Sequence, residues 1–333
     1  MKKVLVSRVR LAVFFCLVMS LGIPLASCSK KEVPALRIST GGMQGNYLNA
    51  GRTIAMIVNE DSGDDSLRLK AEMSSGSVAN INAISSGASE FGFAQADHQY
   101  QALNGLGAWS DKGAQEDLRA VFNVYSESVA LVAGADSGIR SIRDLQGKVV
   151  DIGSPDSGTR RNAIDALRAA GLDSTTDIQA REESLDDRLA MFMRGEIDAF
   201  FYTVAHPNME IKFASFSVRG ARLIPLKSIE IIDSKGSFYT RSLISAETYL
   251  NMNNNADIET LGISATLLAS ANTPEDVVYA ITKATFENLD SLGQFGANFS
   301  ALAEGKALDG LVLPIHPGAL KYYREVGLVT PER

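Results

Sequence analysis

The sequence predicts an α/β fold of two similar lobes that face each other across a cleft. The first observation is a buried strand, a glycine-rich turn and apolar residues at helical spacing within 36–58. The second is the same order of elements within 148–170. The third is that a glycine, a carboxylate and an apolar strand follow one another in both 87–93 and 195–201. Two copies of one plan favour two lobes, although strand-loop-helix units also recur in other α/β proteins.

The N-terminal residues have the pattern of a secretory signal peptide, which we expect over 1–27. Basic residues precede a short apolar run over 11–23, and small residues follow it. This run is shorter than the about 20 apolar residues of a membrane-spanning helix, although an N-terminal anchor is the alternative. Residues 25–28, Leu-Ala-Ser-Cys, resemble the bacterial lipobox. The resemblance implies cleavage before Cys28, lipidation of its thiol with acyl chains such as palmitate, and a tether over 28–35 on the periplasmic side of a bacterial membrane.

Composition limits the classes of partner. Cys16 would leave with the leader, so Cys28 would be the only cysteine of the mature chain and no disulfide could form within it. About 305 residues would remain, which is enough for two domains. The formal net charge of −7 becomes −11 once the four cationic residues of the leader are removed. We therefore expect no nucleic-acid partner.

The order of predicted elements assigns lobe 1 to 36–126 and 238–333, and lobe 2 to 127–237. The chain is expected to cross between the lobes near 125–129 and again near 238–243. A hinge of two segments allows closure around a ligand.

Predicted strands in both lobes end in small polar loops. In lobe 1 these strands cover 36–38, 67–73 and 91–94, and in lobe 2 they cover 148–153 and 197–202. The carboxyl ends of parallel strands share one edge of a sheet, where ligands bind in open α/β folds. We therefore expect a small-molecule site at these loops, in the cleft between the lobes.

The candidate ligand-binding residues come from these loops. In lobe 1 they are Thr40, Gly41, Gly42, Gly45, Asn46, Tyr47, Ser74, Ser77 and Gln95. In lobe 2 they are Ser154, Ser157, Gly158, Thr159, Arg160 and His206. A glycine-rich turn before a helix presents backbone N–H groups and the positive end of the helix dipole, which favours an anion. The glycine spacing is neither that of a dinucleotide fingerprint nor that of a P-loop. A carboxylate held between two helix N-termini is the prediction.

Each candidate has a structural alternative. The glycine turn can be a plain connection, Tyr47 can be a core ring, and Ser74 or Ser77 can cap a helix. Arg160 is the most attractive cation because a guanidinium binds a carboxylate through two parallel hydrogen bonds, and its alternative is an exposed residue of a first helical turn. Arg160→Ala is expected to weaken binding more than tenfold, about 1.4 kcal/mol. His206 is either a specificity residue or a loop histidine, and only titration near neutrality would make binding depend on pH.

No catalytic or metal-binding signature accompanies these loops. The sequence has no G-x-S-x-G, HExxH or paired CxxC motif. His98 and His316 have no second metal-type ligand at a useful spacing, and His316-Pro317-Gly318 predicts a turn into the last helix. We therefore expect a protein that is not an enzyme and that uses neither a metal nor a cofactor.

Six motifs occur in a fixed order over 36–327. They are STGG at 39–42, SSGSVAN at 74–80, FAQAD at 93–97, SGIRSIRDLQGK at 137–148, GSPDSGT at 153–159 and HPGA at 316–319. In this order they resemble the TAXI family of solute receptors of TRAP transporters. The resemblance implies a periplasmic-binding-protein fold of the second type, a membrane permease partner driven by an ion gradient, and a small carboxylate such as glutamate as ligand. The chain departs from the family pattern at His206 and at Arg160-Arg161.

The sequence therefore predicts a lipid-anchored extracytoplasmic receptor that closes on a small anionic organic solute and delivers it to a TRAP permease. The alternatives are a lipoprotein that presents its ligand to a sensor kinase, and an enzyme on the same fold. An ABC-type receptor would have similar lobes, but the ordered motifs argue against it.

Overall fold

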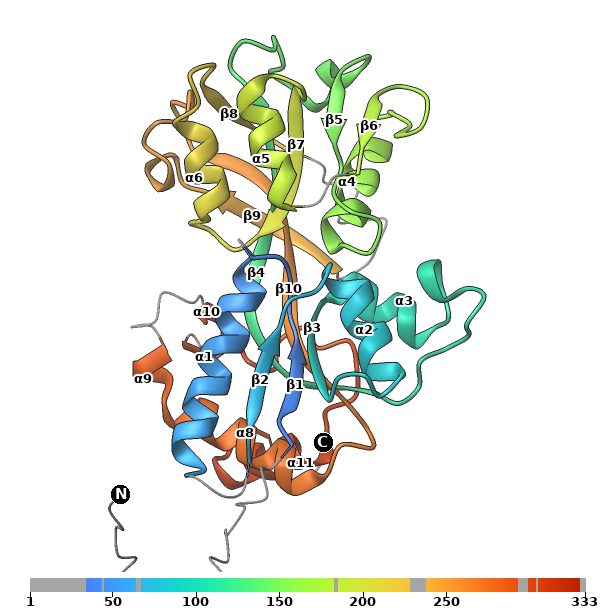
Figure 1. Ribbon diagram of the computed structural model, residues 1–333, viewed down its shortest axis with the longest axis vertical. Coiled ribbons are helices and arrows are strands. Elements are labelled where there is room, and N and C mark those ends of the chain that lie inside the picture. Colours follow the sequence, from blue (N-terminus) through green and yellow to red (C-terminus); the bar gives the residue numbers. More distant parts are fainter. Residues whose placement is uncertain are drawn as a thin grey trace, which may run out of the picture. The chain divides into compact units, whose positions relative to one another are not determined.

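The computed structural model describes residues 34–43, 45–63, 67–182, 185–227, 238–292, 299–303 and 305–329 (Figure 1). The predicted signal peptide, Cys28 and most of the predicted tether lie outside these ranges. Within them, no helix has both the length and the apolar character that crossing a membrane requires.

A mixed sheet of ten strands runs through the described chain in the order β2-β1-β3-β10-β4-β7-β5-β6, and β8 and β9 pair with β4 and β10 off this path. The strands are β1 Leu36–Ser39, β2 Leu69–Glu72, β3 Phe91–Gln95, β4 Leu118–Gly134, β5 Val149–Asp151, β6 Gln179–Arg181, β7 Ala199–Val204, β8 Ala221–Ile224, β9 Tyr239–Ile244 and β10 Ile258–Ser270. We call the elements around β1, β2 and β3 lobe 1, and those around β5, β6 and β7 lobe 2.

The helices flank these strands (Figure 1). The α-helices are α1 Asn46–Asp61, α2 Ser77–Ser85, α3 Ala96–Leu103, α4 Gly158–Ala169, α5 Leu185–Arg194, α6 Met209–Ser215, α8 Glu275–Glu287, α9 Leu289–Leu292, α10 Ser300–Ala303 and α11 Pro317–Glu325. Short 3₁₀ helices are η1 Gly107–Trp109, η2 Ile142–Leu145 and η4 Ala246–Thr248.

Helix α1 follows the apolar spacing of its sequence. Tyr47, Ala50, Ile54 and Val58 recur every three or four residues and are all buried, so one face of the helix packs into the lobe 1 core. Gly45 stands at the N-cap, and Gly45 N donates a hydrogen bond to the Gly42 carbonyl over 2.9 Å. This confirms the predicted strand, glycine turn and helix.

The lobe 2 sheet is covered on both faces because its central strands are apolar at successive positions. On β4, Leu131 packs into one core cluster and Val132 into another. On β7, Phe201 packs into the same cluster as Leu131, and Phe200 packs into the same cluster as Val132. Side chains of adjacent strand residues point to opposite faces, so helices must cover both.

Two long strands connect the lobes (Figure 1). Strand β4 pairs with β10 from Leu118 and with β7 as far as Ala133. Strand β10 pairs with β9 over 258–263 and with β3 over 265–269. The predicted second crossing at 238–243 coincides with β9, and the predicted domain boundaries stay a prediction. The shared strands place the carboxyl ends of β1 to β3 opposite the loops that follow β5 and β7.

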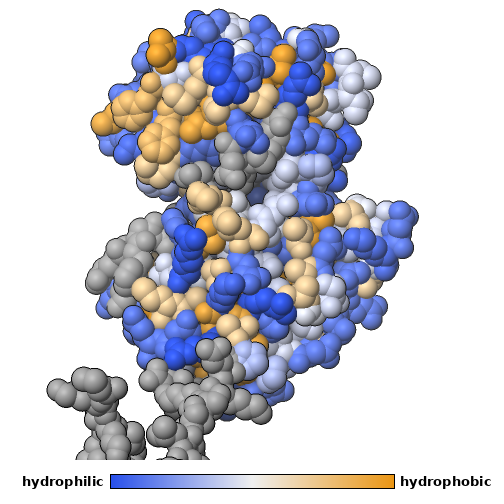
Figure 2. All heavy atoms as spheres, in the orientation of Figure 1, coloured by the Kyte–Doolittle hydropathy of each residue, from blue (hydrophilic) through white to orange (hydrophobic). Residues whose placement is uncertain are grey.

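The face drawn in Figure 2 is mostly polar, with a group of exposed apolar side chains on lobe 2. Met209, Phe213, Phe216 and Val218 are exposed on α6 and just after it, where orange atoms gather in Figure 2.

Candidate functional site

A small cavity lies where the loops of lobe 1 meet the start of α4 and the end of β7. Its lining residues are Gly41, Gly42, Gly45, Asn46, Tyr47, Ser75, Gly76, Ser77, Gln95, Ser157, Gly158, Thr159, Tyr202, Thr203 and Val204. We call it the interlobe cavity. Its volume is about 50 Å³. Most of the predicted site residues are brought together here.

The N-termini of two helices, one from each lobe, meet at the interlobe cavity. Helix α1 begins at Asn46 after the Gly45 cap, and α4 begins at Gly158 after Ser157. The Ser157 hydroxyl accepts a hydrogen bond from Arg160 N over 3.2 Å. The remaining first-turn N–H groups have no partner within the helix, and each helix end carries partial positive charge. None of the described lining residues has a charged side chain.

The lobes touch at the rim of the interlobe cavity. Val78 N in lobe 1 donates a hydrogen bond to the Asp156 carbonyl in lobe 2 over 3.2 Å. Gly76 has a φ of 117° and precedes α2 as its N-cap. A Cβ there would lie 3.5 Å from Ser157 Cα, which is ordinary contact, so the positive φ is what favours glycine at this position.

Gly76 also corrects a prediction about capping. The alternative role of Ser74 or Ser77 as a cap of α2 is wrong, because Gly76 occupies the N-cap and no side chain caps the helix. The Ser74 hydroxyl donates instead within lobe 1, toward the Thr40 carbonyl and Asn80 Oδ1.

A buried carboxyl group lies beneath the interlobe cavity. Glu127 in β4 is 3% exposed, and its Oε2 accepts hydrogen bonds from Tyr47 Oη over 3.1 Å and from Gln95 Nε2 over 2.9 Å. Burial raises the pKa of Glu127 to about 8. Sequence reasoning missed this residue, and the signal was that Glu127 is the one charged residue within 121–133.

Buried polar atoms around the cavity are not all paired. Within the described residues, Gln95 Oε1 and Thr203 Oγ1 have no hydrogen-bond partner, although both side chains line the interlobe cavity and are nearly inaccessible. A buried polar atom without a partner costs about 1–3 kcal/mol. These atoms can therefore bind the polar groups of a small molecule. Thr203 and Tyr202 were not among the predicted site residues.

A buried ion pair packs against the ring of Tyr202. Arg188 Nε and Nη2 donate to the two carboxylate oxygens of Glu210 over 2.8 and 2.7 Å, and both side chains are 1% exposed. The guanidinium carbon lies 4.2 Å from the centre of the Tyr202 ring. A cation over an aromatic face is attractive, so this pair fixes the wall of the cavity that Tyr202 forms.

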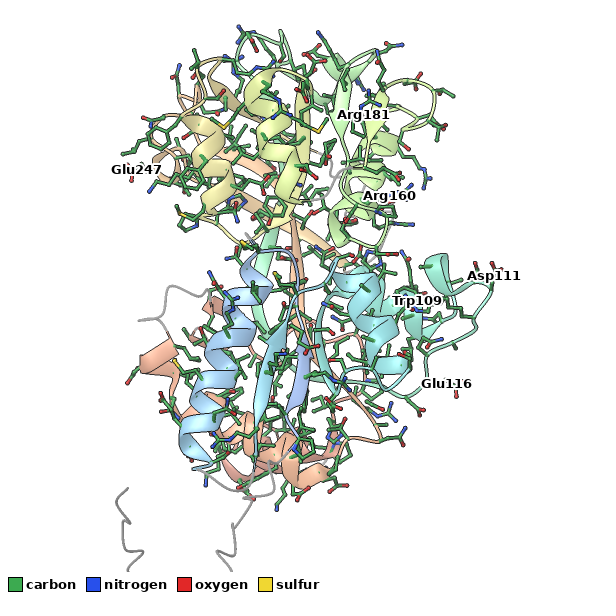
Figure 3. The ribbon with its side chains drawn as sticks, in the orientation of Figure 1. Trp109, Asp111, Glu116, Arg160, Arg181 and Glu247 are labelled. Carbon is green, nitrogen blue, oxygen red and sulfur yellow. The ribbon has the colours of Figure 1, made fainter. Side chains whose placement is uncertain are left out.

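Several predicted residues are not brought to the cavity. Arg160 lies on α4 (Figure 3), and its Nε and Nη2 both donate to Glu182 Oε1, over 2.8 and 2.6 Å. The Thr40 hydroxyl donates to the Glu72 carbonyl inside lobe 1. Ser154 contributes its carbonyl to the turn before Ser157. These residues shape the loops, and the structure does not place them on the lining.

His206 also lies away from the lining. Its Nδ1 is 2.7 Å from the hydroxyl of Tyr249, and burial lowers the pKa of His206 to about 4. The ring is therefore neutral near pH 7. His316 caps α11 by accepting a hydrogen bond from Gly318 N, which confirms the predicted turn into the last helix.

Other cavities are lined differently. One of about 450 Å³ lies at the far end of the lobe 1 strands, beside Glu90, Asp117 and Thr273. Another of about 190 Å³ lies between α3 and α4, beside Phe238 and Tyr239. In the described ranges, no three or more His, Cys, Asp and Glu side chains form a group that would hold a metal ion.

Two α/β lobes, joined by two crossing strands and meeting at a small cavity, define a periplasmic-binding-protein fold of the second type. The same fold occurs in Tv2483 bound to L-arginine, with a TM-score of 0.50 and 11% sequence identity over 81% of this chain and 93% of that chain. The chain belongs to the NMT1-like family, whose match covers residues 38–327.

Two further solved structures resemble the chain more loosely. The alkanesulfonate-binding protein SsuA from Xanthomonas axonopodis pv. citri, bound to MOPS, has a TM-score of 0.48 and 16% identity over 88% of this chain and 91% of that chain. The GluR0 ligand-binding core in complex with L-glutamate has a TM-score of 0.47 and 13% identity over 79% of this chain and 97% of that chain.

Proposed function

We propose that the protein is a lipid-anchored extracytoplasmic receptor that captures a small anionic organic solute, glutamate or a related carboxylate, in the interlobe cavity and delivers it to a TRAP-type permease. One observation carries the proposal: the N-termini of α1 and α4, from opposite lobes, line the same cavity. Backbone N–H groups at helix N-termini bind carboxylates well. The resemblance of the ordered motifs to TAXI receptors supports the TRAP partner.

Capture requires the lobes to separate and close. The interlobe cavity has a volume of about 50 Å³, whereas small-molecule sites commonly measure about 300–1,000 Å³. A solute therefore enters only after the contact between Val78 and Asp156 opens. Rotation about the crossing segments of β4 and β10 provides such a hinge motion. Closure then surrounds the carboxylate with N–H groups from both lobes and excludes water, which strengthens each hydrogen bond.

Recognition depends on hydrogen bonds more than on ion pairs. Arg160 is paired with Glu182 outside the cavity, and the described lining carries no formal charge. The helix dipoles and the backbone N–H groups of the first turns of α1 and α4 take the place of a cation. Such a site selects a solute by the positions of its donors and acceptors.

Native mass spectrometry of the purified protein, followed by thermal-shift screening, tests the proposal. A carboxylate at 100 times its Kd should stabilise the protein by about 2.7 kcal/mol. Stabilisation by neutral sugars or cations, with no effect of any carboxylate, would show that the site does not bind anions.

The membrane anchor is tested separately. Labelling of cells with palmitate should mark the wild-type protein and leave Cys28→Ala unmarked. Label on the variant would place the acyl chain elsewhere.

A further inference from the structure

Glu127 connects the two lobe 1 residues that form the floor of the interlobe cavity. It lies in the segment of β4 that passes between the lobes, opposite Ile263 of β10. Tyr47 reaches it from α1, and Gln95 reaches it from the end of β3. Glu127 itself does not line the cavity, so a solute would contact Tyr47 and Gln95 instead.

The two hydrogen bonds decide which atoms remain for a solute. Tyr47 has one hydroxyl proton, and it is donated to Glu127. Tyr47 can then only accept a hydrogen bond from any further partner. Gln95 turns its Nε2 toward Glu127, so its acceptor Oε1 remains, and this atom has no partner among the described residues. Gln95 is 2% exposed, so water does not readily satisfy that oxygen.

The other groups that face Glu127 do not neutralise its charge. Tyr125 lies two residues away on β4, Tyr202 faces it from β7, and Asp97 faces it from the start of α3. These three groups and Tyr47 are phenols or acids, and none of the described groups that face Glu127 is a cation. A charge without a counter-ion inside a protein is costly, unless a ligand supplies the opposite charge.

We propose that Glu127 is a positioning residue that makes the cavity floor an acceptor surface, so that the site selects solutes with a protonated amino group beside their carboxylate. This inference rests on the proposed function. The helix N-termini donate to the carboxylate, and Gln95 Oε1 and Tyr47 Oη accept from the amino group. Protonation of Glu127 at Oε2 would turn this O–H into a donor toward Gln95, and the Gln95 amide would then have to reverse.

Binding of L-glutamate and glutarate tests the selection, because these probes share two carboxylates and differ in the amino group. Wild type should bind L-glutamate at least tenfold more tightly, about 1.4 kcal/mol. This preference should grow between about pH 7 and about pH 9, as Glu127 ionises. In Glu127→Gln the preference should fall below about threefold and lose its pH dependence. Glu247→Gln, an exposed carboxylate in lobe 2 that Figure 3 labels, should behave as wild type.

A readout without ligand separates this inference from the proposed function. The side-chain amide resonances of Gln95, assigned with Gln95→Leu, should move with pH in wild type and stay constant in Glu127→Gln. Constant resonances in wild type would overturn the role of Glu127, whether or not a solute binds. Equal affinity for the two probes in wild type would also overturn it and leave the carboxylate receptor intact. Failure of every carboxylate to bind would reject the proposed function, and the resonances would still decide the role of Glu127.

Discussion

The side-chain amide of Gln95 in lobe 1 lies against the backbone of Gly158 in lobe 2, so closely that a Cβ at Gly158 would overlap it. The amide is also held by Glu127 over 2.9 Å. Gly158→Ala should therefore either hold the lobes apart or break that hydrogen bond. We expect the affinity for the carboxylate that stabilises wild type to fall at least tenfold, about 1.4 kcal/mol, in calorimetric titration.

Gly41→Ala is the matched control in the same cavity. A Cβ at Gly41 would meet only Tyr47, at 3.5 Å or more, which is ordinary contact. Its affinity should stay within about threefold of wild type. An unchanged affinity in Gly158→Ala would show that the two lobes need not approach this closely when the solute binds.

The buried ion pair beneath Tyr202 should matter for folding. Arg188→Met leaves the Glu210 carboxylate buried without its partner, which costs about 3–5 kcal/mol. The free energy of unfolding from urea denaturation measures the loss. Arg194 and Glu196 form a similar pair with both side chains exposed, so Arg194→Met should have no measurable effect. Equal losses in the two variants would contradict the role of burial.

A second polar cluster joins the lobes beside the hinge. Asn162 Nδ2 in α4 donates to Asp97 Oδ2 over 3.1 Å and to Tyr239 Oη over 2.8 Å. Asn162→Ala leaves the buried Asp97 without this donor, and we expect a loss of about 1–3 kcal/mol in the free energy of unfolding. The exposed Asn272→Ala should change it by less than about 0.5 kcal/mol. A loss of unfolding free energy no larger than that of the control would mean that the cluster does not stabilise the contact between the lobes.

Glu127 should make stability depend on pH. Its pKa is about 8 in the folded protein because of burial, against 4.5 for a free glutamate side chain. The folded state therefore holds a proton between these values that the unfolded state has lost, and stability falls as pH rises through this interval. Glu127→Gln should gain stability relative to wild type by up to about 1.4 kcal/mol per pH unit there. Parallel pH profiles of the two proteins in urea denaturation would contradict the burial of an ionisable Glu127.

Arg160 should have little effect on binding, in contrast to the expectation from sequence. Its guanidinium is engaged by Glu182, and the residue does not line the interlobe cavity. Arg160→Ala should change the Kd by less than about threefold. A loss of more than tenfold would mean that Arg160 leaves Glu182 and turns into the cavity when solute binds.

Local patterns predicted the elements that carry the site. Helix α1 was predictable because its buried positions recur at helical spacing, and β1 because a glycine turn ends it. The helical spacing lies within α1 itself, and the glycine turn directly follows β1. The same local patterns predicted that backbone N–H groups at the N-termini of α1 and α4 would face the site.

Contacts between distant residues could not be predicted in this way. Tyr47 and Gln95 lie 80 and 32 residues from Glu127 in the chain, so nothing local marks the cluster. Arg160 meets Glu182 at a separation of 22 residues. Strand β4 runs without a break over 118–134, although the polar residues of 126–128 interrupt its apolar pattern in the sequence. Those residues lie where the strand passes between the lobes, and they carry the buried carboxyl group.

A crystal structure of the protein with the carboxylate that stabilises it most would test the central claim most directly. We predict that the carboxylate lies in the interlobe cavity, within hydrogen-bonding distance of backbone N–H groups in the first turns of α1 and α4. A ligand bound in the larger cavity beside Glu90 and Thr273, or one that contacts neither helix N-terminus, would contradict the account.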